Sequence, residues 1–226
     1  MQLDHIKNIV KKSGTTFYWG MRILPKKKSN SMFIIYAFCR IVDDISDGKL
    51  DKMKKIQKLH QWKKEINNIY KNKKLTEPIA NQLSGVIKEF QLRKKYFLEI
   101  IDGMEMDAKE NMVSPTESQL KIYCQRVASA VGLLSIKIFG EDNKNSQIYA
   151  KKLGNAFQLT NILRDLKEDS DRKRSYLPKQ LLRKHGINEI DPKKILKHPN
   201  IPKVCSTIAK RAKGFFRAAR IVIKKC

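Results

Sequence analysis

The stretch QLTNILRDLKED, residues 158–169, sets polar side chains at a helical spacing inside apolar sequence. Gln158, Asn161, Asp165 and Asp169 follow one another at intervals of 3, 4 and 4 residues. At ~100° per residue they cover about 80° of a helix surface. Leucine and isoleucine side chains occupy much of the remaining surface. The stretch is therefore predicted to be a helix that carries an Asp-x-x-x-Asp pair on one face.

A second stretch, YAFCRIVDDISD at 36–47, repeats this arrangement. Tyr36, Arg40, Asp43 and Asp47 are 4, 3 and 4 residues apart and fall within about 60° of one another on a helix. Carboxylates at i and i+4 repel each other, and two carboxylates ~4 Å apart do so by about 4 kcal/mol at an effective dielectric of ~20. We therefore expect the two helices to face each other with a cation between them.

The donor atoms in these stretches favour magnesium over zinc. The four histidines are scattered and none neighbours an Asp pair, whereas Mg²⁺ prefers oxygen ligands and keeps waters and substrate phosphates in its shell. Arg40 and Arg164 flank the pairs and are placed to hold phosphate oxygens. The basic run 172–174 can do the same or form a solvated loop. A single Asp-x-x-x-Asp is usually an exposed helix face, but two in-phase copies predict a metal-diphosphate site.

The charge of the chain admits three interpretations. Lys and Arg number 48 against 22 Asp and Glu, a formal net charge of +26. A nucleic-acid protein would usually concentrate this charge in a stripe or tail, and the lysines here are spread through nearly every segment, so no nucleic-acid partner is expected. Solvated lysine faces are the favoured interpretation. Attraction to anionic membrane surfaces or to diphosphate substrates is the third.

Cysteine usage and hydropathy bear on location. The four cysteines show no Cys-x-x-Cys and no framework spacing, which suits a reducing compartment. The N-terminus has no apolar run of the signal-peptide type, and no segment approaches the ~18 apolar residues of a membrane span. We expect a cytoplasmic protein, at most peripheral to the inner membrane.

Helix-period segments follow one another along the whole chain, with no convincing strand, repeat or linker. The fold class is predicted to be all-α, a single domain over residues 1–226 with roughly eight to ten helices in a bundle-like packing. The expected helices cover residues 3–12, 29–47, 51–72, 78–90, 94–109, a segment from 114 to Gly140, 143–169, a short helix ending near 185, and 201–226.

Several boundaries follow from capping residues. The helix at 29–47 is expected to begin with Ser29, Asn30 or Ser31 as N-cap. The sequence SPTE at 114–117 is expected to start a helix with Ser114 as the cap and Glu117 at the capping-box position. Asp142 or Asn143 is expected to cap a long helix that continues through residue 169.

The chain resembles the squalene and phytoene synthases, the head-to-head trans-isoprenyl diphosphate synthases. The resemblance covers about residues 10 to 190 and rests on TTFY at 15–18, the two Asp-bearing stretches, YCQRVASAVG at 123–132 and RKRSYLP ending at 178. FYWGMRILP, DGMEMDA and VGLLSIKIFG resemble the bacterial presqualene diphosphate synthases of squalene and hopanoid biosynthesis in particular. The resemblance implies an isoprenoid-synthase helical bundle with a central prenyl pocket.

The resemblance also implies an activity and roles for residues. The implied reaction is the Mg²⁺-dependent condensation of two farnesyl diphosphates to presqualene diphosphate, with release of diphosphate. The residues implied to bind metal are Asp43, Asp47, Asn161, Asp165 and Asp169. Those implied to contact substrate are Thr16, Phe17, Tyr36, Arg40, Gln158, Arg164 and Tyr176, with Phe17 on the prenyl wall. The residues implied to be catalytic are Tyr123, Asp43, Asp47 and Asp165. Of these, Tyr123 is implied to stabilise the allylic cation or to assist proton loss.

Other interpretations stay open. The family includes phytoene synthases, which join two geranylgeranyl diphosphates, and squalene synthases, which also reduce the intermediate with NADPH; for this chain we expect magnesium and no nicotinamide. Downstream squalene-pathway enzymes are the partners that the resemblance suggests. A non-catalytic lipid-binding or assembly subunit could keep the fold, and from the residues alone Tyr36 and Tyr123 are ordinary core residues. Family members usually extend past the length of this chain, so its C-terminal helices are expected to be shortened.

Overall fold

The computed structural model describes residues 2–109 and 112–226, and side chains from Asp4 onward. These residues contain thirteen α-helices and one π-helical turn. They contain no strand, and the one extended pairing is an isolated parallel bridge between Val113 and Ser175. The predicted all-α class is confirmed. The helices outnumber the expectation for two reasons. The predicted segments 114–140 and 143–169 are each divided into shorter helices, and the helices at 17–22 and 192–197 were not predicted.

The chain divides into two compact units. The first comprises Met1–Ala108 and Leu134–Asp142. Its helices are α1 (Gln2–Lys12), α2 (Phe17–Arg22), α3 (Lys26–Asp47), α4 (Lys52–Tyr70), α5 (Ala80–Glu89) and α6 (Lys94–Ala108), and α8 (Ala130–Phe139) also contributes. Helix α3 packs against α1, α4, α5 and α6. Phe38 of α3 contacts the rings of Trp62 and Phe97 edge-on at centroid distances of 5.5 and 5.4 Å, so α3 forms the centre of this core.

The start of α3 differs from the prediction. The helix begins at Lys26, directly after Pro25, and not at a cap among Ser29, Asn30 and Ser31. The carbonyl of Pro25 accepts the N–H of Ser29 at 2.9 Å, which is the first hydrogen bond of the helix. Proline suits this position because its φ is fixed and because it has no N–H to satisfy. Ser31 lies buried inside the helix and donates its hydroxyl to the Lys27 carbonyl, the bond that a serine within a helix makes when no cap is needed.

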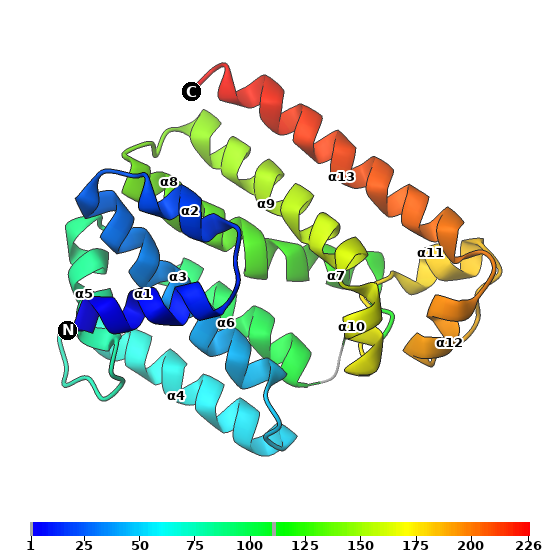
Figure 1. Cartoon of the computed structure of the whole chain (residues 1–226), viewed down its shortest axis with the longest axis horizontal. Helices are drawn as coiled ribbons and strands as arrows, with labels where there is room; N and C mark the ends of the chain where they lie inside the picture. The colour runs from blue at the N-terminus through cyan, green and yellow to red at the C-terminus, as the bar shows by residue number, and fades with distance from the viewer. Residues whose placement is uncertain (1, 110–111) are drawn as a thin grey trace. The chain divides into compact units, whose positions relative to one another are not determined.

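The second unit comprises Lys109–Leu133 and Asn143–Cys226. Its helices are α7 (Glu117–Cys124), the π turn η1 (Gln125–Ser129), α9 (Lys144–Arg164), α10 (Leu166–Asp171), α11 (Lys179–Lys184), α12 (Pro192–Lys197) and α13 (Ile201–Ile223). Helix α13 runs alongside α9, and these two helices form the most extensive helix–helix contact of the unit (Figure 1). Arg211 of α13 also donates to both carboxylate oxygens of Glu117 at 2.7 and 2.9 Å, which ties α13 to the start of α7.

The start of α7 corrects a predicted cap. Thr116, not Ser114, is the N-cap, and the reciprocal capping-box partner is Gln119, not Glu117. Ser114 has a φ of +51°, and its N–H donates to the Ser175 carbonyl at 2.8 Å. Its backbone is therefore committed to the neighbouring segment and is unavailable for a helix start. At the other predicted boundary Asn143, one of the two expected residues, caps α9.

The long helix predicted through residue 169 bends at Asp165. Helix α9 ends at Arg164 and α10 begins at Leu166, because Asp165 has a φ of −99° and a ψ of 11°. Helical hydrogen bonds continue on both sides: the Asp165 N–H reaches the Asn161 carbonyl at 2.9 Å, and the Asp169 N–H reaches the Asp165 carbonyl at 2.8 Å. The aspartates of this stretch therefore lie on two helices that meet at a bend.

The π turn η1 lies within the YCQRVASAVG segment and packs on α9. Asn155 donates to the Ser129 hydroxyl at 3.2 Å. Gly154 lies so close that a Cβ there would come within 2.9 Å of backbone atoms of Ala128 and Ser129. Backbone thus meets backbone at this contact, an approach that only glycine permits. Single π turns of this kind are frequent at functional sites.

One helical stretch in the described residues, Glu117–Phe139, is long and apolar enough to span a membrane by length and composition. The interior helix of a folded domain passes the same test, and 44% of the 18-residue apolar segment within this stretch is buried.

Candidate active site

The predicted site residues are divided between the two units. Arg40, Asp43 and Asp47 belong to the first unit, and the segment from Gln158 to Tyr176 belongs to the second.

In the first unit, Arg40 holds two carboxylates at the C-terminal end of α3. Its guanidinium lies 3.3 Å from Asp43 Oδ2 and 2.6 Å from Asp44 Oδ1. The three residues are spaced as i, i+3 and i+4, neighbouring positions on a helix surface. Arg40 is therefore positioned beside the predicted metal ligand Asp43, and its charge is shared with Asp44.

The carboxyl of Asp43 is crowded by negative charge. Burial, followed by the charge of Asp47, raises the pKa of Asp43 to about 7, against the lowering effect of Arg40. Asp107, whose side chain is buried on α6, and Asp44 raise this pKa further. The lowering effect of Arg40 does not offset burial and these negative charges at Asp43, whose pKa stays raised. A cation at this position would relieve the repulsion.

This crowding predicts a pH-dependent stability in metal-free protein. Because the pKa of Asp43 is raised, the folded state binds this proton more tightly than the unfolded chain does. The resulting stability is fully present below the ordinary value of 3.8 and is lost as the pH rises through about 7. In EDTA, Asp43→Asn should therefore raise the melting temperature at pH 8 more than at pH 5. Thermal melts of Asp44→Asn, whose side chain is 54% exposed, serve as the control; equal pH profiles for Asp43→Asn and wild type would contradict the account.

Other carboxylates of this unit are neutralised by partners. Lys63 of α4 contacts Asp102 at 2.6 Å and Glu105 at 2.5 Å on α6, and His60 lies 3.4 Å from Glu105. The DGMEMDA segment thus contains two kinds of carboxylate. Asp102 and Glu105 have a basic partner in Lys63, and Asp107 raises the pKa of Asp43. In the sequence this segment supported only the family resemblance, and the influence of Asp107 on Asp43 was not predicted. The sequence could not predict this influence, because it depends on the packing of α6 on α3.

In the second unit, Arg164 forms a bidentate pair with Asp165. Arg164 Nε and Nη2 each lie 2.7 Å from a carboxylate oxygen of Asp165. Paired parallel bonds of this kind are strong and geometrically specific. Arg164 remains 67% exposed, so it can turn toward an incoming anion.

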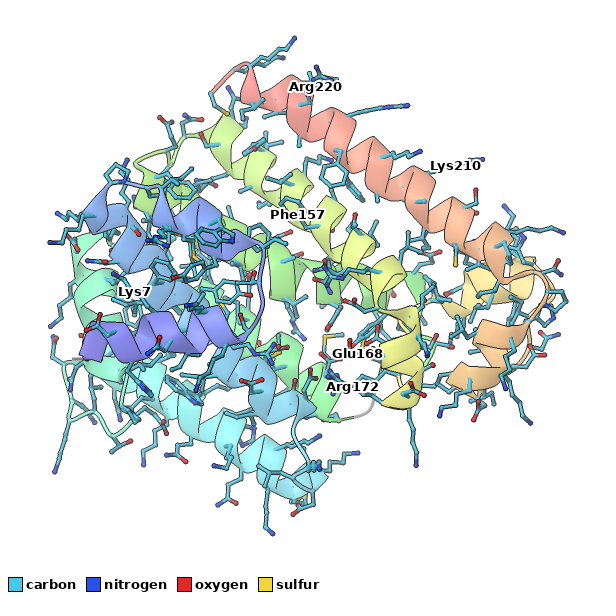
Figure 2. The ribbon with its side chains drawn as sticks, in the orientation of Figure 1. Lys7, Phe157, Glu168, Arg172, Lys210 and Arg220 are labelled. Carbon is cyan, nitrogen blue, oxygen red and sulfur yellow. The ribbon has the colours of Figure 1, made fainter. Side chains whose placement is uncertain are left out.

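Around this pair lies an open hollow of about 480 Å³. Its lining consists of three acidic and three basic side chains: Arg164, Asp165, Lys167, Glu168, Asp171 and Arg172. Figure 2 shows Glu168 of α10 near Arg172, the residue that follows this helix, and Arg172 lies 2.7 Å from Glu168. The hollow has polar walls suited to an ionic ligand. Arg172 belongs to the basic run that the sequence left open between phosphate contact and solvated loop.

Asp169 lies on the other side of the bend. It lines a narrow crevice together with Tyr176 and α12, and its carbonyl accepts the Arg174 N–H at 2.8 Å. Gln158 and Asn161 are half-buried on α9. Asp165 and Asp169 therefore line different hollows of the second unit, which the predicted single stripe did not anticipate.

Tyr176 stacks on Tyr123. The ring centroids are 5.0 Å apart with an interplanar angle of 24°, and both side chains are buried. The segment before α11 reaches this position because the Ser175 N–H donates to the Met112 carbonyl at 3.1 Å and the Lys179 N–H donates to the Pro115 carbonyl at 2.9 Å. The structure thus brings together two tyrosines that are far apart in the sequence.

The remaining predicted residues belong to the first unit. Thr16 is exposed and precedes α2, Phe17 begins α2 with 51% of its side chain exposed, and Tyr36 is half-buried on α3. An exposed phenylalanine is compatible with contact to an apolar ligand.

The donor atoms near Asp43 fit magnesium. They are carboxylate oxygens, which Mg²⁺ prefers, and their crowding calls for a cation. In the second unit both carboxylate oxygens of Asp165 are already bound by Arg164. A metal ion at Asp165 would therefore have to share this carboxylate with Arg164. Among the described residues no group of three or more His, Cys, Asp and Glu side chains is arranged to hold a metal ion. The five-residue ligand set therefore stays a prediction.

The sequence matches the family model for squalene/phytoene synthase over residues 10–226. The chain belongs to the squalene/phytoene synthase family. A presqualene diphosphate synthase of Rhodopseudomonas palustris is 41% identical over 212 residues, which cover 94% of this chain and 75% of that protein. A phytoene synthase of Mycobacterium tuberculosis is 34% identical over 181 residues, which cover 80% and 59%. The family resemblance predicted from the sequence is confirmed.

The fold agrees with this family. A crystal structure of a dehydrosqualene synthase in complex with a ligand aligns with a TM-score of 0.86 and 28% sequence identity, covering 99% of this chain and 77% of that one. The expected isoprenoid-synthase type of helical fold is confirmed. Both Asp-bearing stretches and both stacked tyrosines lie within residues 10–226, the part that matches the squalene/phytoene synthase model.

Proposed function

We propose that this chain is a presqualene diphosphate synthase, a prenyltransferase that joins two farnesyl diphosphates head to head. The observation that carries the proposal is the crowded carboxylate cluster at Asp43, which calls for a cation, in a chain 41% identical to a presqualene diphosphate synthase. The lower identity to a phytoene synthase, 34%, makes two geranylgeranyl diphosphates the second choice of substrate.

The metal ligands in this proposal come from both units. Asp43 and Asp47 supply oxygens from α3, and Asn161, Asp165 and Asp169 supply them from the bend between α9 and α10. Bound magnesium supplies positive charge that stabilises a departing diphosphate. The two units are proposed to act as one isoprenoid synthase domain in which these ligands serve the same substrate.

The arginines have a separate role. Arg40 and Arg164 each hold a carboxylate now, and each has a planar guanidinium that can bind two phosphate oxygens at once. Gln158, one helical turn before Asn161, is proposed to contact the diphosphate as well. These residues orient the leaving group, so that the bond to be broken points toward the prenyl pocket.

The C1–O bond of one farnesyl diphosphate breaks, and its electron pair leaves with the diphosphate. The C2–C3 double bond of the second molecule attacks the allylic cation at C1. Loss of one proton closes the cyclopropane and gives presqualene diphosphate. Released diphosphate is the base that accepts the proton.

Aromatic rings are proposed to stabilise the cation. The stacked pair of Tyr123 and Tyr176 presents an electron-rich face in a buried position, and such faces attract cations. Tyr36 is proposed to line the same site, with Thr16 and Phe17 at the prenyl wall. Tyr123 either stabilises the cation through its ring or assists the proton loss.

The finer assignments belong to the same proposal. The cofactor is Mg²⁺, with no NADPH, since the reaction stops before reduction. Enzymes that process presqualene diphosphate to squalene and hopanoids are the proposed downstream partners. The protein is proposed to be cytoplasmic with peripheral contact to the membrane, where farnesyl products accumulate because of their long apolar chains.

Incubation of purified protein with Mg²⁺ and either prenyl donor tests the substrate. We expect farnesyl diphosphate, without NADPH, to give presqualene diphosphate or its dephosphorylated alcohol on extraction and mass analysis. Phytoene from geranylgeranyl diphosphate alone would move the assignment to the second choice. A folded sample that consumes neither donor would contradict an enzymatic function and favour a lipid-binding or assembly subunit.

A further inference from the structure

Helix α2 turns two large apolar side chains outward. Trp19 is 65% exposed and Ile23, directly after the helix, is 85% exposed. They are four residues apart and so lie on one face, and the Ile23 N–H donates to the Trp19 carbonyl at 3.3 Å. Met21, on another face of the same helix, is only 4% exposed. The helix is therefore attached by one side and presents the other to its surroundings.

The exposed tryptophan is held in place by packing. Tyr18 contacts Trp19 edge-on at 5.4 Å and contacts Phe33 of α3 at 5.5 Å. Arg22 lies over the Trp19 ring at 5.5 Å. An aromatic side chain that is fixed by two neighbours and still exposed is a built surface feature and not a loose end.

The sequence around this face carries only positive charges. Residues 5–42 contain eight Lys and Arg and no Asp or Glu. Arg22 and Lys26 are exposed beside Trp19 and Ile23. Farther along α3, Lys27 is paired with Glu89 of α5, and Lys28 donates to the Phe139 carbonyl. The face formed by Trp19, Arg22, Ile23 and Lys26, here named the α2 face, thus combines apolar and cationic groups.

We propose that the α2 face docks on an anionic phospholipid bilayer. Tryptophan favours the boundary between headgroups and acyl chains, and an apolar residue beside it adds buried area. Arg22 and Lys26 would meet lipid phosphates, which attract basic residues near a membrane surface. A second copy of the chain carries the same net charge of +26, so pairing of two α2 faces would bring like charges together.

Tryptophan fluorescence offers a direct probe of this docking. The chain has two tryptophans, and Trp62 is only 2% exposed, so a change on lipid addition reports Trp19. With vesicles of phosphatidylcholine and phosphatidylglycerol, we expect a blue shift and quenching by lipids brominated in the acyl chain. Vesicle binding with unchanged Trp19 emission would overturn the proposal, because it would indicate adsorption through the overall positive charge.

Two surface variants test the apolar contact. Ile23→Ser should weaken vesicle binding roughly ten-fold, since the side chain would no longer be buried in lipid. Met53→Ser is the matched control, because Met53 is 75% exposed on α4 of the same unit. Equal binding by Ile23→Ser and Met53→Ser in flotation assays would overturn the proposal, as would an absence of vesicle binding by wild type. The assays contain no metal or prenyl substrate, so their outcome is independent of the proposed enzymatic function.

Discussion

Asp43→Asn is expected to slow diphosphate release from farnesyl diphosphate by about a thousand-fold, the equivalent of roughly 4 kcal/mol of lost stabilisation at the leaving group. Asp43 lies beside Arg40, and the charges of Asp47 and Asp107 also act on its carboxyl. An amide keeps the shape of the side chain and removes the charge that binds the cation. Diphosphate release under saturating Mg²⁺ measures the effect.

The adjacent residue provides the control. Asp44 is on the same helix and binds the same arginine at 2.6 Å, but 54% of its side chain is exposed. We expect Asp44→Asn to reduce the rate by less than about ten-fold, the scale of a surface ion pair. Similar losses for Asp43→Asn and Asp44→Asn would show that general negative charge on α3, and not the position of Asp43, supports the reaction.

The same comparison applies to the second unit. Asp165 and Asp171 line one hollow, but Asp165 pairs with Arg164, whereas Asp171 pairs with Lys193 at 2.9 Å. Asp165→Asn should cause a loss comparable to that of Asp43→Asn, and Asp171→Asn a small one. Because groups that act as a unit have non-additive effects, the double variant of Asp43 and Asp165 should lose little more than either alone. Independent, multiplying losses would contradict a shared site.

Gly154→Ala should destabilise the protein by about 2 kcal/mol, because the added Cβ would have no room. It would come within 2.9 Å of backbone atoms of Ala128 and Ser129, and backbone cannot move aside as a flexible side chain can. For a chain of this size we expect the melting temperature to fall by roughly 4–8 °C. Calorimetry or thermal circular dichroism measures the shift.

A second glycine gives the opposite expectation. Gly214 lies inside α13, and a Cβ added there would have no neighbouring atom within 4 Å. Gly214→Ala should therefore stabilise the protein by up to about 1 kcal/mol, since alanine is the better helix former. If Gly154→Ala were as stable as wild type while Gly214→Ala behaved as expected, the close contact of η1 with α9 would be wrong.

Periodicity was enough to predict most helices. The segments later found as α1, α4, α6 and α13 were predicted within a few residues because an apolar stripe at helical spacing is a local property. The expected end of a helix at Gly140, where φ is +87°, was equally local. These features depend on neighbours in sequence, which a single chain displays directly.

The missed features comprise contacts between distant segments and one local bend. Ser114 looked like a cap, but its backbone is bound to Ser175. The bend at Asp165 interrupts an unbroken helical pattern, and a bidentate pair with Arg164 lies at the bend. The π turn at 125–129 packs against Gly154. None of these has a signal in the spacing of residues along the chain.

The candidate site was predictable in part for the same reason. The two Asp pairs, with Arg40, Asn161 and Arg164, were predicted as site residues from their spacing, because each set lies on its own helical stretch. The influence of Asp107 on Asp43 requires the packing of α6 on α3. The stacking of Tyr176 on Tyr123 requires the contacts of residues 112–115 with 175–179.

The most direct test of the proposed reaction is its stoichiometry. Formation of presqualene diphosphate breaks one C1–O bond, so one diphosphate should be released for every two farnesyl diphosphates consumed, only with Mg²⁺ present, and NADPH should not change the ratio. Parallel assays of released diphosphate and remaining farnesyl diphosphate measure it. Equal amounts of diphosphate released and substrate consumed would contradict the account, because both diphosphates would then leave and the reaction would continue past presqualene diphosphate.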